Sequence, residues 1–152
     1  MKRRSSMLLV LCLLASCGGQ KQVSTQPTTS DPMRTIAIQV DRAAQGLDAA
    51  IDVKRALLRD GLITQAQSAA LTPKILTAIR LVRELKDTLA TVDSFQSGKP
   101  QLAEVFARVQ GGFAALSDLG IIPSGQARDK IGNALQIAVT ALQGLKPLLG
   151  GA

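Results

Sequence analysis

Hydrophobic residues recur at helical spacing through most of the chain after Asp31. Spacings of three and four residues, with one gap, connect the first set of apolar positions, which are Met33, Ile36, Val40, Ala43, Leu47, Ala50 and Leu57. This period places a single apolar stripe along a helix. Ser30 or Asp31 can cap its start, Pro32 suits the first helical position, and Gly61 suits the residue after its end. We therefore expect the first helix over residues 32–60.

Three more segments carry stripes of the same kind. The stripes are Ile75, Ile79, Val82, Leu85, Leu89 and Val92, then Leu102, Val105, Phe106, Val109, Phe113 and Leu116, then Ala127, Ile131, Leu135, Ala138, Leu142, Leu145 and Leu149. No segment alternates with the period of two that half-buried strands show. The pattern predicts an all-α fold, an up-down antiparallel four-helix bundle over residues 31–149. A weak echo between Gly61-Leu62-Ile63 and Gly120-Ile121-Ile122 leaves open a duplication into two similar helical hairpins.

Proline and glycine interrupt three of the four segments. Proline costs about 3 kcal/mol in a helix interior, so Pro73 predicts a short helix at 65–71, capped by Thr64 with Gln67, and a restart at Thr72. The sequence Ser97-Gly98-Lys99-Pro100 predicts the next break, and Pro147 should bend or end the fourth helix. Gly111-Gly112 lies inside the third helix at a cost of about 1 kcal/mol per glycine. We expect another helix to pack closely there, and the alternative is a bend in the helix.

The first thirty residues follow a different pattern. Three basic residues at positions 2–4 precede nine consecutive apolar residues, MLLVLCLLA, at positions 7–15. Nine helical residues span about 14 Å, less than half of the ~30 Å hydrocarbon core of a membrane. A basic start and a short apolar run are typical of a secretory signal peptide. Residues 18–30 are rich in Gly, Gln, Ser and Thr, which predicts a flexible tether.

The apolar run ends in Leu14-Ala15-Ser16-Cys17, which resembles the lipobox of bacterial lipoproteins. The resemblance implies a signal peptide of residues 1–16, cleavage before Cys17, and acyl chains on Cys17 that hold the protein to a bacterial membrane. Residues 17–30 would then be the lipidated cysteine and its tether. Gly18, where inner-membrane lipoproteins carry Asp, implies the outer membrane, facing the periplasm, in a Gram-negative cell. The alternatives are an ordinary signal peptide with an incidental cysteine and a buried N-terminal helix.

Composition excludes several kinds of chemistry. The chain has no histidine, and its two cysteines, Cys12 and Cys17, both precede the tether. The helical body therefore has no His-based nucleophilic pair, no thiolate metal site and no disulfide framework. Its carboxylates lie at positions expected on solvated helix faces near Lys or Arg. We expect neither an enzyme nor a protein with a cofactor or metal.

The charge balance is basic, with 18 Lys and Arg against 11 Asp and Glu. Loss of the signal peptide removes three of these cations and lowers the excess. With three Phe and no Tyr or Trp, the chain lacks stacking platforms for single strands, so we expect no nucleic-acid partner. A local excess forms what we call the basic set, which is Lys54, Arg55, Arg59, Lys74, Arg80, Arg83 and Lys86. The basic set predicts contact with anionic head groups, against the alternative of ordinary solvated helix faces.

Two functions agree with this sequence. We expect a non-enzymatic envelope lipoprotein whose bundle is a scaffold or docking module for an envelope protein or an anionic lipid surface. The alternative is a carrier or sensor that binds a small apolar ligand between the helices. An exposed apolar groove on a packed bundle would favour docking, whereas an internal cavity of a few hundred Å³ would favour the carrier.

Overall fold

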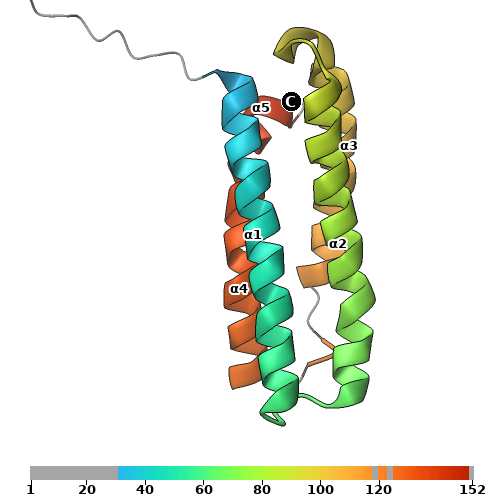
Figure 1. The fold of residues 1–152 in the computed structure, drawn as a ribbon, viewed down its shortest axis with the longest axis vertical. Helices are drawn as coiled ribbons and strands as arrows, with labels where there is room; N and C mark the ends of the chain where they lie inside the picture. Colours follow the sequence, from blue (N-terminus) through green and yellow to red (C-terminus); the bar gives the residue numbers. More distant parts are fainter. Residues whose placement is uncertain (1–30, 118–119, 123–124, 151–152) are drawn as a thin grey trace, which may run out of the picture.

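Over the residues that the structure describes, the protein is an all-α bundle of four long helices and one short one. The structure is a computed structural model that describes residues 31–117, 120–122 and 125–150, so the predicted signal peptide and Cys17 lie outside the described residues. Its helices are α1 (Pro32–Arg59), α2 (Gln65–Thr91), α3 (Phe95–Ser117), α4 (Gln126–Gln143) and α5 (Lys146–Leu149). The long helices lie side by side and alternate in direction (Figure 1). The predicted up-down antiparallel bundle is confirmed.

The long helices do not pack equally around the bundle. Helix α1 packs along α4 and α2, and α2 packs along α3, whereas α3 and α4 meet much less. The α1–α2 pair and the α3–α4 pair therefore differ in their packing, which does not favour two similar hairpins. The bundle is closed on three sides and more open between α3 and α4.

Local capping explains where α1 begins and ends and where α2 begins. The Asp31 carboxylate accepts a hydrogen bond from the Met33 N–H at 3.0 Å. The predicted capping box at α2 is present, since the Thr64 hydroxyl accepts from the Gln67 N–H and the Gln67 side chain accepts from the Thr64 N–H. Gly61 adopts a φ of 70°, which favours glycine and turns the chain from α1 into the connection.

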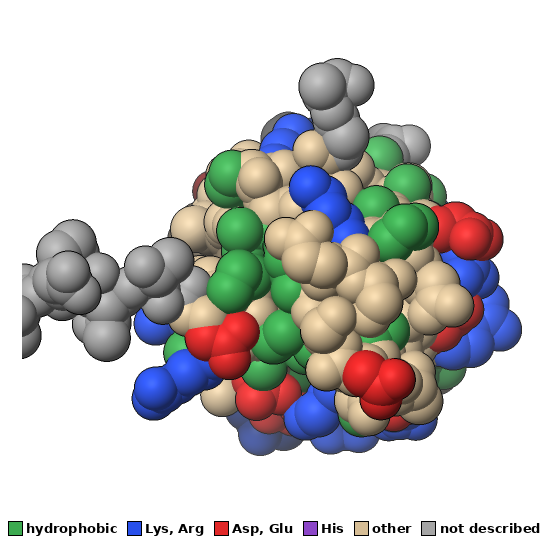
Figure 2. Space-filling model, turned by 90° about the horizontal axis from the view of Figure 1, so that it is seen from above, with side chains coloured by type: hydrophobic (Ala, Val, Ile, Leu, Met, Phe, Trp, Pro, Cys, Tyr) green, Lys and Arg blue, Asp and Glu red, His purple; other side chains and the backbone are tan. Residues whose placement is uncertain are grey.

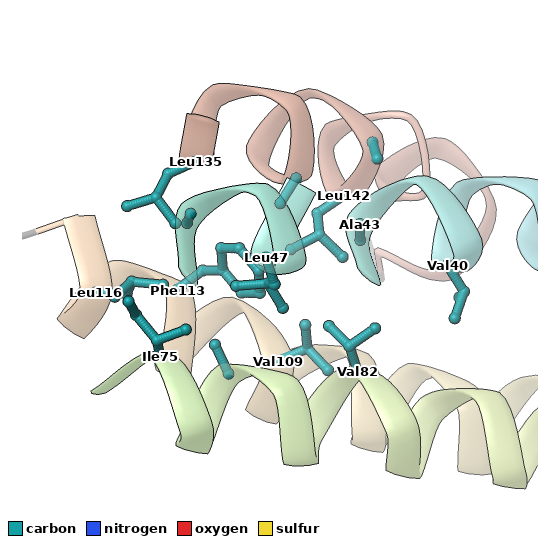
Figure 3. Packing of buried hydrophobic residues seen from close by; sticks show 14 of the residues in the cluster. Val40, Ala43, Leu47, Ile75, Val82, Val109, Phe113, Leu116, Leu135 and Leu142 are labelled. Atoms are coloured by element: carbon teal, nitrogen blue, oxygen red, sulfur yellow. The ribbon is translucent and has the colours of Figure 1, made fainter. Parts of the chain in front are cut away.

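The predicted stripes form the core. Every residue of the third stripe is buried. In the other three stripes most residues are buried, and those that are partly buried are Met33, Ile79, Leu89, Val92 and Ala127. Figure 3 shows core side chains from all four long helices pointing toward one another, with Leu47 and Phe113 at the centre. The connections add Ile63 and Ile122, which are also buried. Because the apolar stripes face one another, hydrophobic burial holds the helices together.

The expectation of a helix break at Pro73 is wrong, because α2 runs unbroken through it. Proline removes one backbone hydrogen bond, but the buried Leu71 and Ile75 on either side keep the helix against the core. Burial of two such side chains contributes about 3–6 kcal/mol, which offsets the ~3 kcal/mol cost of the proline. The Thr72 hydroxyl also donates to the Ser68 carbonyl at 2.8 Å and accepts from the Lys54 Nζ of α1 at 2.6 Å.

The expected break at residues 97–100 is also wrong, because α3 already begins at Phe95. The turn instead lies just before it, where the Gly98 N–H donates to the Ser94 carbonyl at 3.0 Å. Gly98 lies directly over Val92, since a Cβ on this glycine would be 2.4 Å from the Val92 Cβ. Glycine is therefore needed for the close approach of the turn rather than for ending a helix. The fourth segment is interrupted as expected, but earlier than Pro147: α4 ends at Gln143, and the short α5 begins at Lys146 with Pro147 as its second residue.

Glycine marks the closest contacts between helices. A Cβ at Gly112 would lie 2.5 Å from the Leu81 side chain of α2, as expected, whereas Gly111 has open space around it. A second close approach, this time to backbone atoms, lies between α1 and α4, and the stripe pattern did not predict it. There a Cβ at Gly46 would be 2.6 Å from the backbone nitrogen of Ala138. Backbone atoms cannot move aside as a flexible side chain can, so Gly46 sets the spacing of α1 and α4.

Charged substitution of a stripe residue should destabilise the bundle strongly. Leu85→Asp or Val109→Asp places an unpaired charge where the present side chain is fully buried, and we expect a loss of about 3–5 kcal/mol in the free energy of unfolding. Leu76→Asp is the matched control because Leu76 is 54% exposed. Urea unfolding followed by circular dichroism measures all three. Equal losses for buried and exposed positions would contradict the stripe assignment.

Two glycine substitutions should change the stability of the bundle in opposite directions. Gly111→Ala adds a methyl group into open space and removes a flexible residue from a helix, so we expect a gain of about 0.5–1 kcal/mol. Gly46→Ala has the same propensity gain but forces α1 away from Ala138, and we expect a net loss of about 1–3 kcal/mol. Thermal unfolding of both variants beside the parent measures the difference. A stabilised Gly46→Ala protein would show that α1 and α4 do not need this contact.

Candidate functional site

Part of the basic set lies along the boundary between α1 and α2. Lys54 and Arg55 line a small groove of about 110 Å³ with Thr72 and Leu76. Arg83 and Lys86 line a second groove of about 190 Å³, where Asp48 lies among the apolar residues. These four cations therefore contact the α1–α2 boundary, but at two separate grooves.

Acidic residues accompany several members of the basic set. Lys86 Nζ lies 2.8 Å from the Asp41 carboxylate and links α2 to α1. Arg55 and Arg59 lie 3.3 Å and 3.2 Å from the carboxylates of Asp52 and Asp60. All these side chains are largely exposed, so each pair contributes at most about 1 kcal/mol to stability. Their main effect is to lower the positive potential along the boundary.

The remaining members of the basic set are Lys74 and Arg80, which lie apart from the ion pairs described above. Lys74 extends toward α3, where its Nζ donates to the Ala115 carbonyl at 3.3 Å, and Arg80 is exposed on α2. The structure therefore does not bring all seven residues onto one face. It also adds an interhelix ion pair that the pattern did not single out, in which Arg108 of α3 lies 2.7 Å from the Glu84 carboxylate of α2.

Within residues 31–117, 120–122 and 125–150, no three or more His, Cys, Asp or Glu side chains come together as a metal site would require. Among the helices described, none is both long and apolar enough to cross a membrane. Cys17, the predicted lipid-attachment residue, lies outside this part of the chain.

Two wider surface grooves run along α4. The first, of about 400 Å³, lies between α4 and α1 and includes Gln39, Arg42 and Ile137. The second, of about 380 Å³, lies between α4 and α3, where the two helices pack least, and includes Phe113, Leu142 and Lys146. Both are open to solvent and have more apolar than polar surface. The apolar stripes do not reveal these grooves, because a stripe assigns each apolar position to one core and does not predict unequal helix spacing.

The end of the bundle at the start of α1 has no single sign of charge. Figure 2 looks onto this end and shows acidic and basic side chains interspersed among hydrophobic and neutral ones. Mixed charges give weak and short-ranged electrostatic attraction to a charged surface. The grooves along α4 are therefore the more distinctive surface feature.

Comparison with known proteins found no matching family model, no similar curated protein and no similar solved structure. The fold and the surface define the class of protein as a helical bundle with open interhelix grooves. Its function must therefore be argued from the residues of this chain.

Binding to anionic vesicles tests the basic set. We expect residues 31–152 to bind anionic vesicles weakly and to lose this binding as salt rises, because the attraction is screened. Replacing Arg80, Arg83 and Lys86 by Gln should weaken binding more than replacing Arg34, Lys99 and Lys146, which lie outside the set. Vesicle sedimentation measures both variants. Equal effects, or equal binding to neutral vesicles, would identify the basic set as ordinary solvated residues.

Proposed function

We propose that this protein is a lipoprotein anchored through Cys17, and that its bundle is a docking module rather than an enzyme or a carrier. The sequence Leu14-Ala15-Ser16-Cys17, directly after a short apolar run, is the observation that carries the anchor. The proposed place is a bacterial envelope membrane. In a Gram-negative cell it is the outer membrane, facing the periplasm.

The burial of the apolar residues within the bundle supports a membrane anchor that lies outside the bundle. The stripes of α1 to α4 are buried against one another. In the part of the chain that the structure describes, the exposed large hydrophobic residues are Ile38, Leu62, Leu76 and Ile137. Scattered apolar residues of this kind do not insert a protein into a bilayer. One acyl chain gives only marginal membrane binding, whereas two or more give stable anchoring, as lipoprotein modification would supply.

The shape of the surface supports docking over ligand carriage. A carrier needs an enclosed cavity that removes a small apolar ligand from water. The two wide depressions along α4 are instead open grooves, which suit a partner that lies across the helices. A tether of about thirteen residues reaches at most about 45 Å, so the sides of the bundle can face a partner while the anchor stays in the membrane.

Replacing the two cysteines separately tests the anchor. We expect the parent and Cys12→Ser, whose residue lies in the removed segment, to fractionate with membranes as processed bands labelled by a fatty-acid precursor. We expect Cys17→Ser to lose the label, because the acceptor thiol is absent. It should also leave the membrane fraction unless its uncut signal holds it. Absence of label from the parent, or retained label in Cys17→Ser, would contradict the proposal.

A further inference from the structure

Helix α3 is held less firmly to α4 than to α2. Arg108 of α3 pairs with Glu84 of α2, and a Cβ at Gly112 would lie 2.5 Å from the Leu81 side chain. Between α3 and α4, in contrast, packing is sparse and an open groove of about 380 Å³ remains. Over the residues that the structure describes, no hydrogen bond or ion pair joins these two helices. The α3–α4 side is therefore the least firmly fastened side of the bundle.

The short helix α5 supplies a link that this side otherwise lacks. In Figure 1 it lies at the end of the bundle where α1 begins, and it turns from the end of α4 toward α3. Its four residues pack against α3 to a similar extent as all eighteen residues of α4 do. Leu145, directly before α5, and Leu149 are 0% and 1% exposed, and their spacing of four residues places both on one helical face. Helix α5 therefore joins α3 to the end of α4, with buried leucines as its inner face.

The joint between α4 and α5 can turn without breaking either helix. The Leu145 N–H donates three residues back, to the Leu142 carbonyl at 3.1 Å, which is a tight turn rather than a continued α-helix. Pro147 has no N–H with which to extend the hydrogen bonds of α4. Within α5, the N–H groups of Leu148 and Leu149 donate to the Leu145 carbonyl at 3.0 Å and 2.9 Å. Detachment of α5 from α3 therefore leaves the backbone hydrogen bonds of both helices in place.

We propose that α5 is a strap that holds the α3–α4 side closed, and that its release opens this side while the α1–α4 and α2–α3 pairs stay packed. Opening one side of a bundle exposes less buried surface than unfolding it, so the opening needs less free energy. The pairs stay packed because Gly46 brings α1 against the backbone of Ala138, and Gly112 brings α3 against Leu81. The α1–α2 boundary, which is also well packed, then acts as the hinge.

Release of the strap widens the groove between α3 and α4. Lys146, the first residue of α5, lines this groove together with Phe113 and Leu142. Both apolar side chains are only 5% exposed in the closed bundle, and Figure 3 shows them in the core between the helices. The position of α5 therefore controls how much apolar surface the groove offers.

Fluorine NMR can detect this opening without adding a new type of side chain. The three phenylalanines of the chain, Phe95, Phe106 and Phe113, all lie in α3. Para-fluorophenylalanine incorporated into the full chain reports on each ring, and a Phe113→Leu variant assigns the signal of that residue. A soluble gadolinium chelate broadens each signal according to its exposure. In the parent it should broaden the Phe113 signal little, because the ring is buried.

Replacing Leu145 and Leu149 together by Ala removes the inner face of the strap. We expect the broadening of the Phe113 signal to rise at least about threefold while circular dichroism shows that the helical content is retained. Leu57→Ala is the matched control, because Leu57 is equally buried but lies at the other end of α1, away from the strap. This variant loses a core leucine and should leave the broadening of the Phe113 signal unchanged.

The single variant Leu149→Ala replaces the double variant if the latter loses its helical content, and it should broaden the same signal by a smaller factor. An unchanged Phe113 signal in folded strap variants would overturn the proposal. Equal broadening in Leu57→Ala would also overturn it, because that result would indicate a general loosening of the core. The strap does not depend on the proposed anchor, so absence of lipid from Cys17 would leave these expectations as they are.

Discussion

The close contact between α1 and α4 is the constraint on which the rest of the bundle depends. Gly46 allows the backbone of α4 to approach at Ala138, and alanines on both helices extend the contact along their length. Small side chains contribute little hydrophobic area each, but they bring two helices close enough for many favourable van der Waals contacts. This packing fixes the first and last long helices together, and α2 and α3 complete the core against them. The looser α3–α4 side and its groove are what remain once the other three sides are packed.

Much of the fold was predictable because one physical signal dominates it. The spacing of Ile36, Val40 and Leu47 in α1, and of Leu102, Phe106 and Val109 in α3, requires one helical face to be buried, and the structure buries it. The breaks at Pro73 and at residues 97–100 were predicted wrongly because the cost of a proline is local. The compensation comes instead from side chains that pack against other helices, such as Leu71 and Ile75. A sequence pattern shows the local cost of the proline but not the packing that compensates for it.

The candidate site was less predictable than the fold. The basic set is a cluster in sequence, but Lys74 extends toward α3 while Lys86 pairs with Asp41 of α1, so closeness along a helix does not give a common face. The open grooves along α4 could not be read from the apolar stripes. Those grooves follow from unequal helix spacing. Residues such as Gly46 set this spacing through contacts with residues about ninety positions further along the chain.

The pairing of α1 with α4 also affects when the chain can fold. Gly46 and Ala138 are separated by most of the bundle in sequence, so their contact closes a long loop. During synthesis α1 emerges first and α4 last, and one side of α1 stays without its partner until nearly the whole chain is made. A protein with this topology completes its core only when its last long helix is present. In the lipoprotein proposed here, such a late closure would keep the body unfolded while it is threaded through a membrane.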